Sequence, residues 1–283
     1  MIQAKHRSRL PLPQPAVVHL RRSYSDCRYG QVHVWTAYPS GGGFDERTPI
    51  LCLHHAGGSG RLFAPVLREI GNDRSIYAPD LPGHGTSDVP SSRASVADFA
   101  AAVGDFLDSL RLRSVDVIGY QLGALTAAEL AIARPQQVRR VMLWGLAPYS
   151  PQERSTLLSQ AAALGSKEDG SDVVDEWRNA LERRGPGVPM SALTDSFSDR
   201  LRSGSQGTKS FAAVLDYPLS ERLPLLKQPS AVLRLRDEFG EYAPRVRSSL
   251  PNSTLLDLQE HGRDFISAAP QRFASTVREF FDR

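Results

Sequence analysis

The sequence predicts an α/β protein: a mostly parallel central sheet with helices on both faces and an inserted helical cap. Strand-length apolar runs alternate with helix-length amphipathic stretches over most of the chain, an alternation typical of βαβ units. A polar stretch broken by Gly and Pro, from about residue 150 to residue 226, interrupts this pattern. With 283 residues, 41% of them hydrophobic, the chain can bury one large core.

The elements are expected in a regular order. Residues 17–23 and 31–38 alternate in polarity around a turn, which favours an antiparallel hairpin at a sheet edge. The buried strands are predicted at 50–54, 75–78, 115–119, 138–144 and 231–235, and the helices at 61–71, 95–110, 122–134 and 270–283. Right-handed crossovers would place these helices on both faces of the sheet. We therefore expect a loose arm at 1–15, a core of 16–149 and 227–283, and a cap at 150–226.

Composition excludes several functional classes. The net charge is only +3 and the basic residues are spread along the chain, so no nucleic-acid partner is expected. Cys27 and Cys52 are the two cysteines, too few for a disulfide framework. No apolar run reaches the roughly 20 residues that cross a bilayer, which predicts a cytoplasmic protein without membrane attachment. No zinc-ligand spacing, dinucleotide fingerprint or phosphate loop is present, so neither a metal nor a cofactor is expected.

One strand-to-helix turn carries the most specific motif. The apolar run from Val115 leads into Gly119-Tyr120-Gln121-Leu122-Gly123 and then into a helical stretch. This resembles the G-x-S-x-G nucleophile elbow of the α/β-hydrolase superfamily. Small residues are needed on both sides because the central residue of such a turn is strained. The resemblance places Gln121 where the family has its serine.

A second motif follows the first buried strand. Leu53-His54-His55-Ala56-Gly57-Gly58-Ser59-Gly60 is similar to the family's H-G-x-x-G-S loop. By this resemblance, the backbone N–H groups of Ala56 and Leu122 would form an oxyanion hole. Three side chains next to these motifs, His55, Tyr120 and Trp144, are expected to contact the substrate.

The segment after the next strand is interpreted as structural. Asp80-Leu81-Pro82-Gly83-His84-Gly85-Thr86-Ser87 is similar to a loop that recurs in this superfamily. Asp80 is expected to tie the loop together. His84 is expected to be a loop residue and not a catalytic base.

The resemblance also implies a general base and an acid near the C-terminus. His261-Gly262 precedes the last predicted helix, where the family has its catalytic histidine. The acid should follow the strand that begins near Pro229, and both Glu238 and Asp237 fit that position. His261, one of these two acids and Gln121 are therefore the predicted catalytic side chains.

The function predicted from these residues lacks covalent catalysis, because a carboxamide is a very poor nucleophile. The favoured hypothesis is a cofactor-independent enzyme of lyase, cyclase or isomerase type, in which His261 moves a proton on an apolar molecule that carries a carbonyl group. Two alternatives remain open. One is hydrolysis of an ester, lactone or C–C bond by water that His261 activates, and the other is a non-catalytic protein that holds a ligand.

Three further points stay open at the level of sequence. Gln121 is either natural or an engineered inactivating substitution. Aromatic residues of the cap are compatible with a pocket lining and equally with core packing: Trp177, Phe197, Phe211 and Tyr217. A homodimer is compatible with the sequence, but nothing in it specifies one.

Overall fold

The strands form one eight-stranded sheet in the computed structural model, which describes residues 18–39, 47–161 and 163–283. Their order across the sheet is β1-β2-β4-β3-β5-β6-β7-β8. The bounds are β1 Arg21–Cys27, β2 Gly30–Ala37, β3 Ile50–Leu53, β4 Ile76–Pro79, β5 Val115–Tyr120, β6 Val138–Trp144, β7 Ser230–Arg236 and β8 Ser253–Gly262.

Strand direction follows the predicted pattern. The β1–β2 hairpin is antiparallel and lies at one edge, where β2 also runs antiparallel to β4. All the other neighbours are parallel. The predicted α/β-hydrolase fold with a mostly parallel sheet is confirmed. The predicted arm at 1–15 and the first residue of the predicted hairpin lie outside the described residues.

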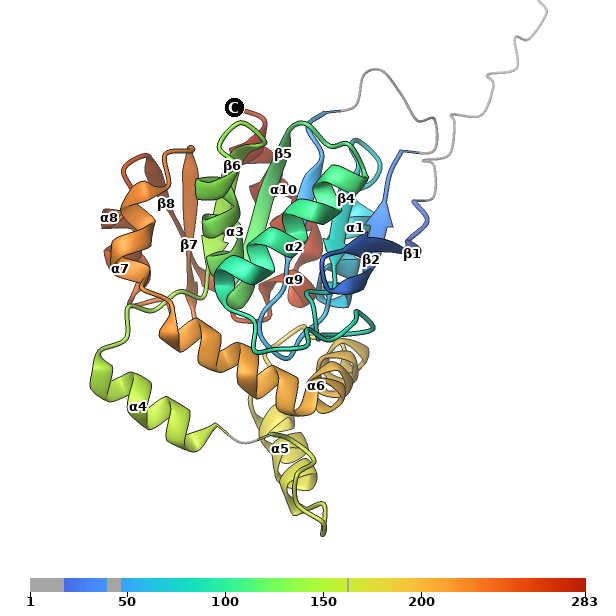
Figure 1. The fold of residues 1–283 in the computed structure, drawn as a ribbon, viewed down its shortest axis with the longest axis vertical. Helices are drawn as coiled ribbons and strands as arrows, with labels where there is room; N and C mark the ends of the chain where they lie inside the picture. Colours follow the sequence, from blue (N-terminus) through green and yellow to red (C-terminus); the bar gives the residue numbers. More distant parts are fainter. Residues whose placement is uncertain (1–17, 40–46, 162) are drawn as a thin grey trace, which may run out of the picture.

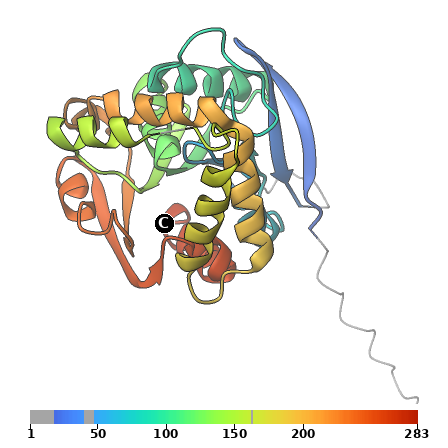
Figure 2. The ribbon, with the colours of Figure 1, turned by 90° about the horizontal axis from the view of Figure 1, so that it is seen from below.

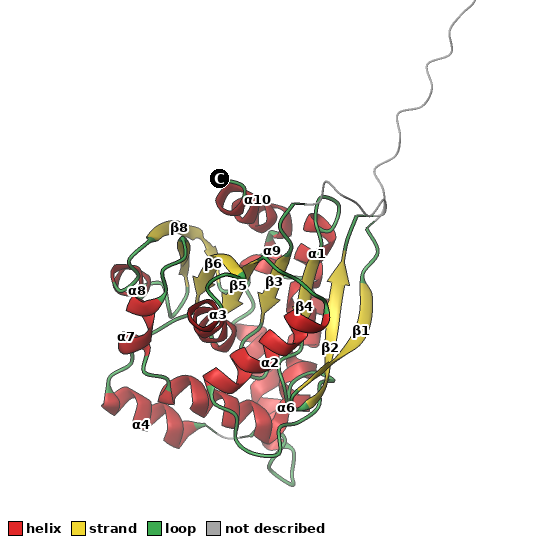
Figure 3. Cartoon of the chain, turned by 45° about the horizontal axis from the view of Figure 1, so that its top comes forward, coloured by secondary structure: helices red, strands yellow, loops and turns green. Residues whose placement is uncertain are grey.

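Helices cover both faces of the sheet (Figure 1; Figure 3). Helices α2 (Val96–Ser109), α3 (Leu122–Ala133) and α8 (Ala243–Ser248) pack in one apolar layer. Helices α1 (Ala64–Ile70), α9 (Phe265–Ala268) and α10 (Pro270–Phe281) pack in the other. A short 3-10 turn, η1 (Gly60–Phe63), leads into α1. The two faces of the sheet are therefore buried, as parallel strands require.

The chain between β6 and β7 is helical. It contains α4 (Pro151–Gln160), α5 (Ser171–Glu182), α6 (Met190–Asp216), α7 (Leu219–Arg222) and the turn η2 (Leu223–Leu225). We call residues 150–226 the cap. Figure 1 and Figure 2 show α4, α5 and α6 beyond the carboxyl ends of the parallel strands. Helix α6 bends at Gly204, whose φ of 44° and ψ of −124° interrupt the helical backbone.

A buried polar contact fastens α6 to the core. The hydroxyl of Ser59 donates to Asp199 at 2.5 Å, and Arg61 donates to the other oxygen of the same carboxylate at 2.6 Å. Arg61 also pairs with Asp195, at 3.1 Å. The segment that follows β3 therefore anchors α6 of the cap.

No helix in the described part of the chain is both long and apolar enough to span a bilayer.

Candidate functional site

Gln121 lies at the sharp turn between β5 and α3. Its backbone has φ 50° and ψ −110°, a conformation that side-chain-bearing residues rarely adopt. Its N–H donates to the carbonyl of Trp144 at 3.0 Å, and its own carbonyl accepts from the N–H groups of Ala124 and Leu125 at 2.9 and 3.0 Å. These bonds hold the strained residue at the carboxyl edge of the sheet.

The two glycines of the motif are required by close packing. A Cβ atom on Gly119 would lie 2.4 Å from the carbonyl oxygen of Gly123, and one on Gly123 would lie 2.0 Å from the carbonyl oxygen of Leu53. Both distances are far shorter than a van der Waals contact. The spacing of the motif is therefore set by how tightly α3 crosses β5 and β3.

The loop after β3 carries two histidines with different surroundings. The ring of His54 is fully buried: its Nε2 accepts from the N–H of Leu81 and its Nδ1 donates to the carbonyl of His55, each at 2.8 Å. Burial lowers the pKa of His54 to about 3. His54 is therefore a neutral structural link between two loops.

His55 lies against Tyr120, with ring centroids 5.2 Å apart. Its Nδ1 is buried and has no hydrogen-bond partner among the described residues. Burial, and after it the electrostatic effects of His84, Arg200 and Arg263, lower the pKa of His55 to about 4. His55 is therefore neutral near pH 7.

The loop after β4 is organised by Asp80, in agreement with its structural interpretation. Its carboxylate accepts from the N–H groups of Gly60 at 2.7 Å and Thr86 at 3.0 Å, and it lies 3.0 Å from Nδ1 of His33. Burial alone would raise the pKa of Asp80, but these contacts hold it below its usual value. His84 is buried beside His54, and its Nδ1 lies 3.2 Å from the carbonyl of Pro82.

The structure pairs the predicted acid with an arginine. Arg263 donates to Glu238 at 2.5 Å. The pairing follows from strand register, because Arg236 of β7 lies opposite Gly262 of β8, so the residues that follow each strand are neighbours. The opposite charges of Glu238 and Arg263 after adjacent parallel strands were the signal in the sequence for this contact.

Asp237, the alternative acid, is turned toward the backbone. Its Oδ1 accepts from the N–H of Phe239 at 2.9 Å, and burial raises its pKa. This contact stabilises the turn after β7 and leaves Glu238 as the acid that extends toward the end of β8.

The structure does not bring His261 to either predicted acid. His261 lies inside β8, its ring stacks on Phe265 with centroids 3.9 Å apart, and its Nε2 is 3.7 Å from Glu260. Within the described chain, His261 forms no hydrogen bond or ion pair with Asp237 or Glu238. A register shift between β7 and β8 extends the strand past His261 and makes Arg263 the neighbour of Glu238.

Two of the predicted substrate contacts lie in an aromatic stack. Tyr120 and Trp144 are parallel, with centroids 5.0 Å apart. Trp144 is only 3% exposed and also packs edge-on against Phe63 and Phe273. It is a core residue, because β6 is buried on both faces at this point. Burial raises the pKa of Tyr120, and the nearby charge of Glu238 raises it further.

The two predicted oxyanion-hole donors flank the elbow. Leu122 is the first residue of α3, where a backbone N–H has no acceptor within the helix. The N–H of Ala56 has no hydrogen-bond partner among the residues that the structure describes. Both amides are therefore free to bind a ligand oxygen.

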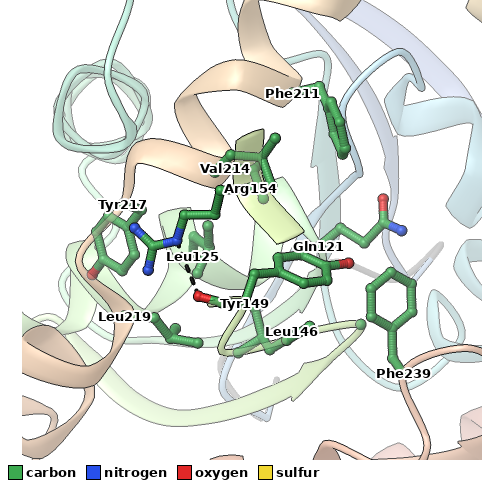
Figure 4. A pocket seen from close by; sticks show the side chains of 13 residues that line it. Gln121, Leu125, Leu146, Tyr149, Arg154, Phe211, Val214, Tyr217, Leu219 and Phe239 are labelled. Carbon is green, nitrogen blue, oxygen red and sulfur yellow. Dashed lines mark hydrogen bonds between the residues drawn. The ribbon is translucent and has the colours of Figure 1, made fainter. Parts of the chain in front are cut away.

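A cavity opens at Gln121, between the carboxyl edge of the sheet and the cap (Figure 4). The space within it, open solvent included, is about 500 Å³. The lining is mostly apolar, with contributions from α3, from the segment after β6 and from α6: Gln121, Leu125, Gly145, Leu146, Ala147, Tyr149, Arg154, Phe211, Val214, Leu215, Tyr217, Leu219 and Phe239.

Of the predicted site residues, Gln121 lines this cavity, and so do two of the four cap aromatics, Phe211 and Tyr217. The other two cap aromatics, Trp177 and Phe197, pack on each other with centroids 5.0 Å apart. Sequence reasoning missed Tyr149 and Arg154. Their signal was their place just after β6, at the edge of the sheet where the elbow lies.

A second cavity lies beside α2, α3 and α6, and the space within it is about 990 Å³ with open solvent included. The Tyr217 hydroxyl donates to Glu129 of α3 at 2.9 Å, and Arg222 binds the same carboxylate at 2.5 and 3.0 Å. Tyr217 belongs to the linings of both cavities.

No group of acidic, histidine or cysteine side chains that could hold a metal ion is found in the described ranges.

Comparison with known proteins identifies short stretches of similarity to several enzymes. The chain is 33% identical over 120 residues to 2-hydroxymuconate semialdehyde hydrolase of Pseudomonas sp. (strain CF600), covering 40% of each chain. It is 29% identical over 131 residues to 1-acylglycerol-3-phosphate O-acyltransferase ABHD5 of Rattus norvegicus, covering 45% of this chain and 36% of that protein. A 35% identical match to uncharacterized protein Rv2715 of Mycobacterium tuberculosis spans only 28% of that relative's length.

Solved structures match over nearly the full length. An enol-lactonase from Burkholderia xenovorans LB400 superposes with a TM-score of 0.77 at 17% identity, covering 92% of this chain and all of that one. A hydrolase from Pseudomonas aeruginosa PA01 superposes with a TM-score of 0.74 at 21% identity, covering 93% and 98%. At these identities the likeness concerns the fold.

The family model described as alpha/beta hydrolase fold matches residues 48–254, which is more than half of the chain. The sheet order, the strained turn at Gln121 and the inserted helices agree with this match. The chain belongs to the α/β-hydrolase family.

Proposed function

We propose that this chain holds an apolar small molecule with a carbonyl or carboxyl oxygen in the Gln121 cavity, without forming a covalent intermediate. Gln121 is proposed to stand at the nucleophile position of the family. Its carboxamide cannot form an acyl-enzyme, but it offers a donor and an acceptor to a ligand oxygen. The apolar walls support the same ligand class.

The composition of the cavity wall carries this proposal. None of the described residues that line it is His, Cys, Asp, Glu or Lys, so none exchanges a proton readily near pH 7. A proton-transfer enzyme needs such a group within hydrogen-bond reach of its substrate. The wall therefore favours binding over chemical conversion, and this reverses the preference that the sequence alone supports.

A cofactor-independent enzyme is the second candidate, because relatives in the family are mostly enzymes, and two of those matched are named as a semialdehyde hydrolase and an enol-lactonase. In this candidate, His261 moves a proton in a lyase, cyclase or isomerase reaction, or activates water to cleave an ester, lactone or C–C bond. His261 would have to leave Phe265 to do so. His55, neutral and with an unpartnered Nδ1, supports this candidate as a second possible base.

The test measures binding and conversion in the same sample. A panel of apolar esters, lactones, ketones and acids is screened for compounds that raise the melting temperature of the protein. Each ligand is then recovered, and its mass is measured by mass spectrometry. We expect stabilisation with unchanged ligand. A Leu125→Trp variant, which fills the cavity, should lose the stabilisation.

Conversion of a ligand that His261→Ala or His55→Ala abolishes would overturn the binding function and establish the enzyme. Stabilisation that survives Leu125→Trp would place the ligand outside this cavity and contradict the proposal.

A further inference from the structure

Arg154 is the cationic side chain in the lining of the Gln121 cavity. It lies on α4 and is half-buried, and its Nε donates to the backbone carbonyl of Tyr149 at 3.1 Å. This bond fixes the direction of the guanidinium. The two terminal nitrogens of Arg154 have no hydrogen-bond or ion-pair partner among the described residues.

Other arginines around the cap and the sheet edge have carboxylate partners. Arg61 binds Asp199, Arg222 binds Glu129, and Arg263 binds Glu238. No acidic side chain in the described chain lines the cavity beside Arg154. A partly desolvated cation without a partner is costly, because the surrounding apolar groups cannot replace the water that it loses.

Figure 4 shows where this charge lies relative to the rest of the cavity. Arg154 lies on the same side as Leu125 and Tyr217, while Gln121 and Phe239 lie on the other. A ligand that spans the cavity would therefore meet a cation at one end and a carboxamide at the other, with apolar contacts between them.

We propose that the ligand is a carboxylic acid that binds as its anion, with the carboxylate on the terminal nitrogens of Arg154 and the carbon chain along Leu125. This inference rests on the proposed function, since it names the class of ligand that the Gln121 cavity holds. The planar guanidinium matches a carboxylate with two parallel N–H···O bonds. Of the two polar ends of the cavity, Arg154 binds the carboxylate, and Gln121 is left to bind a second oxygen in those acids that carry one at the opposite end.

The experiment compares acids with amides of the same shape. Octanoate and phenylacetate are titrated into the full chain by calorimetry, beside octanamide and phenylacetamide, which keep the carbon skeleton and lose the charge. The same titrations are repeated with Arg154→Gln. Arg178→Gln is the matched control, because Arg178 is a cap arginine on the surface, 69% exposed and paired with Asp175.

We expect the acids to bind the unmodified chain and the Arg178→Gln variant about 10- to 100-fold more tightly than the amides. Arg154→Gln should remove this difference by weakening the acids, while the amides keep their weak binding. Retained amide binding also shows that the variant is folded.

Equal affinity for acid and amide, or a preference for the acid that survives Arg154→Gln, would overturn the inference and leave the proposed function standing. If neither acids nor amides bind, while neutral esters or lactones stabilise the chain and Leu125→Trp removes their effect, the inference alone fails. If no compound of either panel binds, both fail.

Discussion

Gln121 has the strained backbone of a sharp strand-to-helix turn, and within the described chain His261 is not paired with either predicted acid. Glu238, one of the two predicted acids, binds the guanidinium of Arg263, which stays charged at any ordinary pH. In the proposed function, neither the Gln121 carboxamide nor the Arg263 guanidinium acts as a nucleophile or a base. Introducing a serine at position 121 alone should therefore not produce hydrolysis.

We expect Gln121→Ser alone to gain no hydrolysis of aryl esters, because no described His, Asp, Glu or Lys side chain lines the cavity to accept the serine proton. The double variant Gln121→Ser/Arg263→His places an imidazole beside Glu238 and should exceed the single variant on the order of 100-fold. Release of nitrophenol from an aryl acetate measures the rate, and intact mass detects the acyl adduct. Gln121→Ala/Arg263→His is the control without a nucleophile.

Equal esterase activity in the single and double serine variants would contradict this prediction and show that another base serves the site.

The buried ring of His54 should make the fold sensitive to acid. Its pKa is about 3 in the folded chain and about 6.5 when unfolded, so only the unfolded state binds the proton between these values. The stability that neutral His54 provides is complete above about pH 6.5 and is lost as the pH falls toward about 3, by about 1.4 kcal/mol per pH unit.

Urea unfolding at a series of pH values should therefore show a shallower pH slope for His54→Gln than for the unmodified chain, by about one proton. The absolute stability of the variant is not the readout, since it also loses two hydrogen bonds. His19→Gln, at an exposed position, is the control for the loss of one histidine. A slope unaffected by His54→Gln would mean that the ring does not titrate with unfolding.

At the scale of elements, the crossing of α3 over β5 and β3 sets the geometry of the cavity. The helix passes so close to the strands that only glycine fits at the crossing. This closeness also brings the first turn of α3 to the carboxyl edge of the sheet, where Gln121 and Leu125 face the cavity.

Gly123→Ala should destabilise the fold by about 1–3 kcal/mol or more, because its Cβ would overlap the backbone oxygen of Leu53. Denaturant unfolding measures the change in free energy. Gly185→Ala is the matched control, since its Cβ would meet only ordinary contacts at 3.7 Å. A loss for Gly185→Ala as large as for Gly123→Ala would refute the steric explanation.

Elements with a regular pattern could be predicted from the sequence, and those decided by tertiary contact could not. The strand predicted at 138–144 agrees with β6, and the elbow motif lies between β5 and α3 as predicted. Both could be predicted because the periodicity of apolar residues and the spacing of glycines are local features of the sequence. The length of β8 is different. Its extension through His261 depends on a register shift against β7, and no pattern within residues 253–262 predicts that shift.

At the scale of the whole molecule, the cap is attached through few buried polar contacts. Asp199 receives bonds from both Ser59 and Arg61 and is only 6% exposed. The sequence could not predict which aromatic residues of the cap line the cavity. Phe211 and Tyr217 do so, whereas Trp177 and Phe197 pack on each other. The direction of each side chain depends on how α6 lies over the sheet.

Asp199→Ala should loosen the cap, with a loss of about 1.5–3 kcal/mol from bonds to a charged group. Limited proteolysis with trypsin, which can cut at Arg200, Arg202 and Lys209 in α6, should become faster. Asp195→Ala, which removes the more exposed partner of Arg61, should have a smaller effect. Equal cleavage rates for the two variants would show that the buried contact does not secure α6.

Tyr217 belongs to the linings of both cavities, the Gln121 cavity and the larger space bounded by α2, α3 and α7. Its hydroxyl donates to Glu129, whose carboxylate also binds Arg222. The shape of both cavities is therefore coupled to one polar contact that joins the cap to α3.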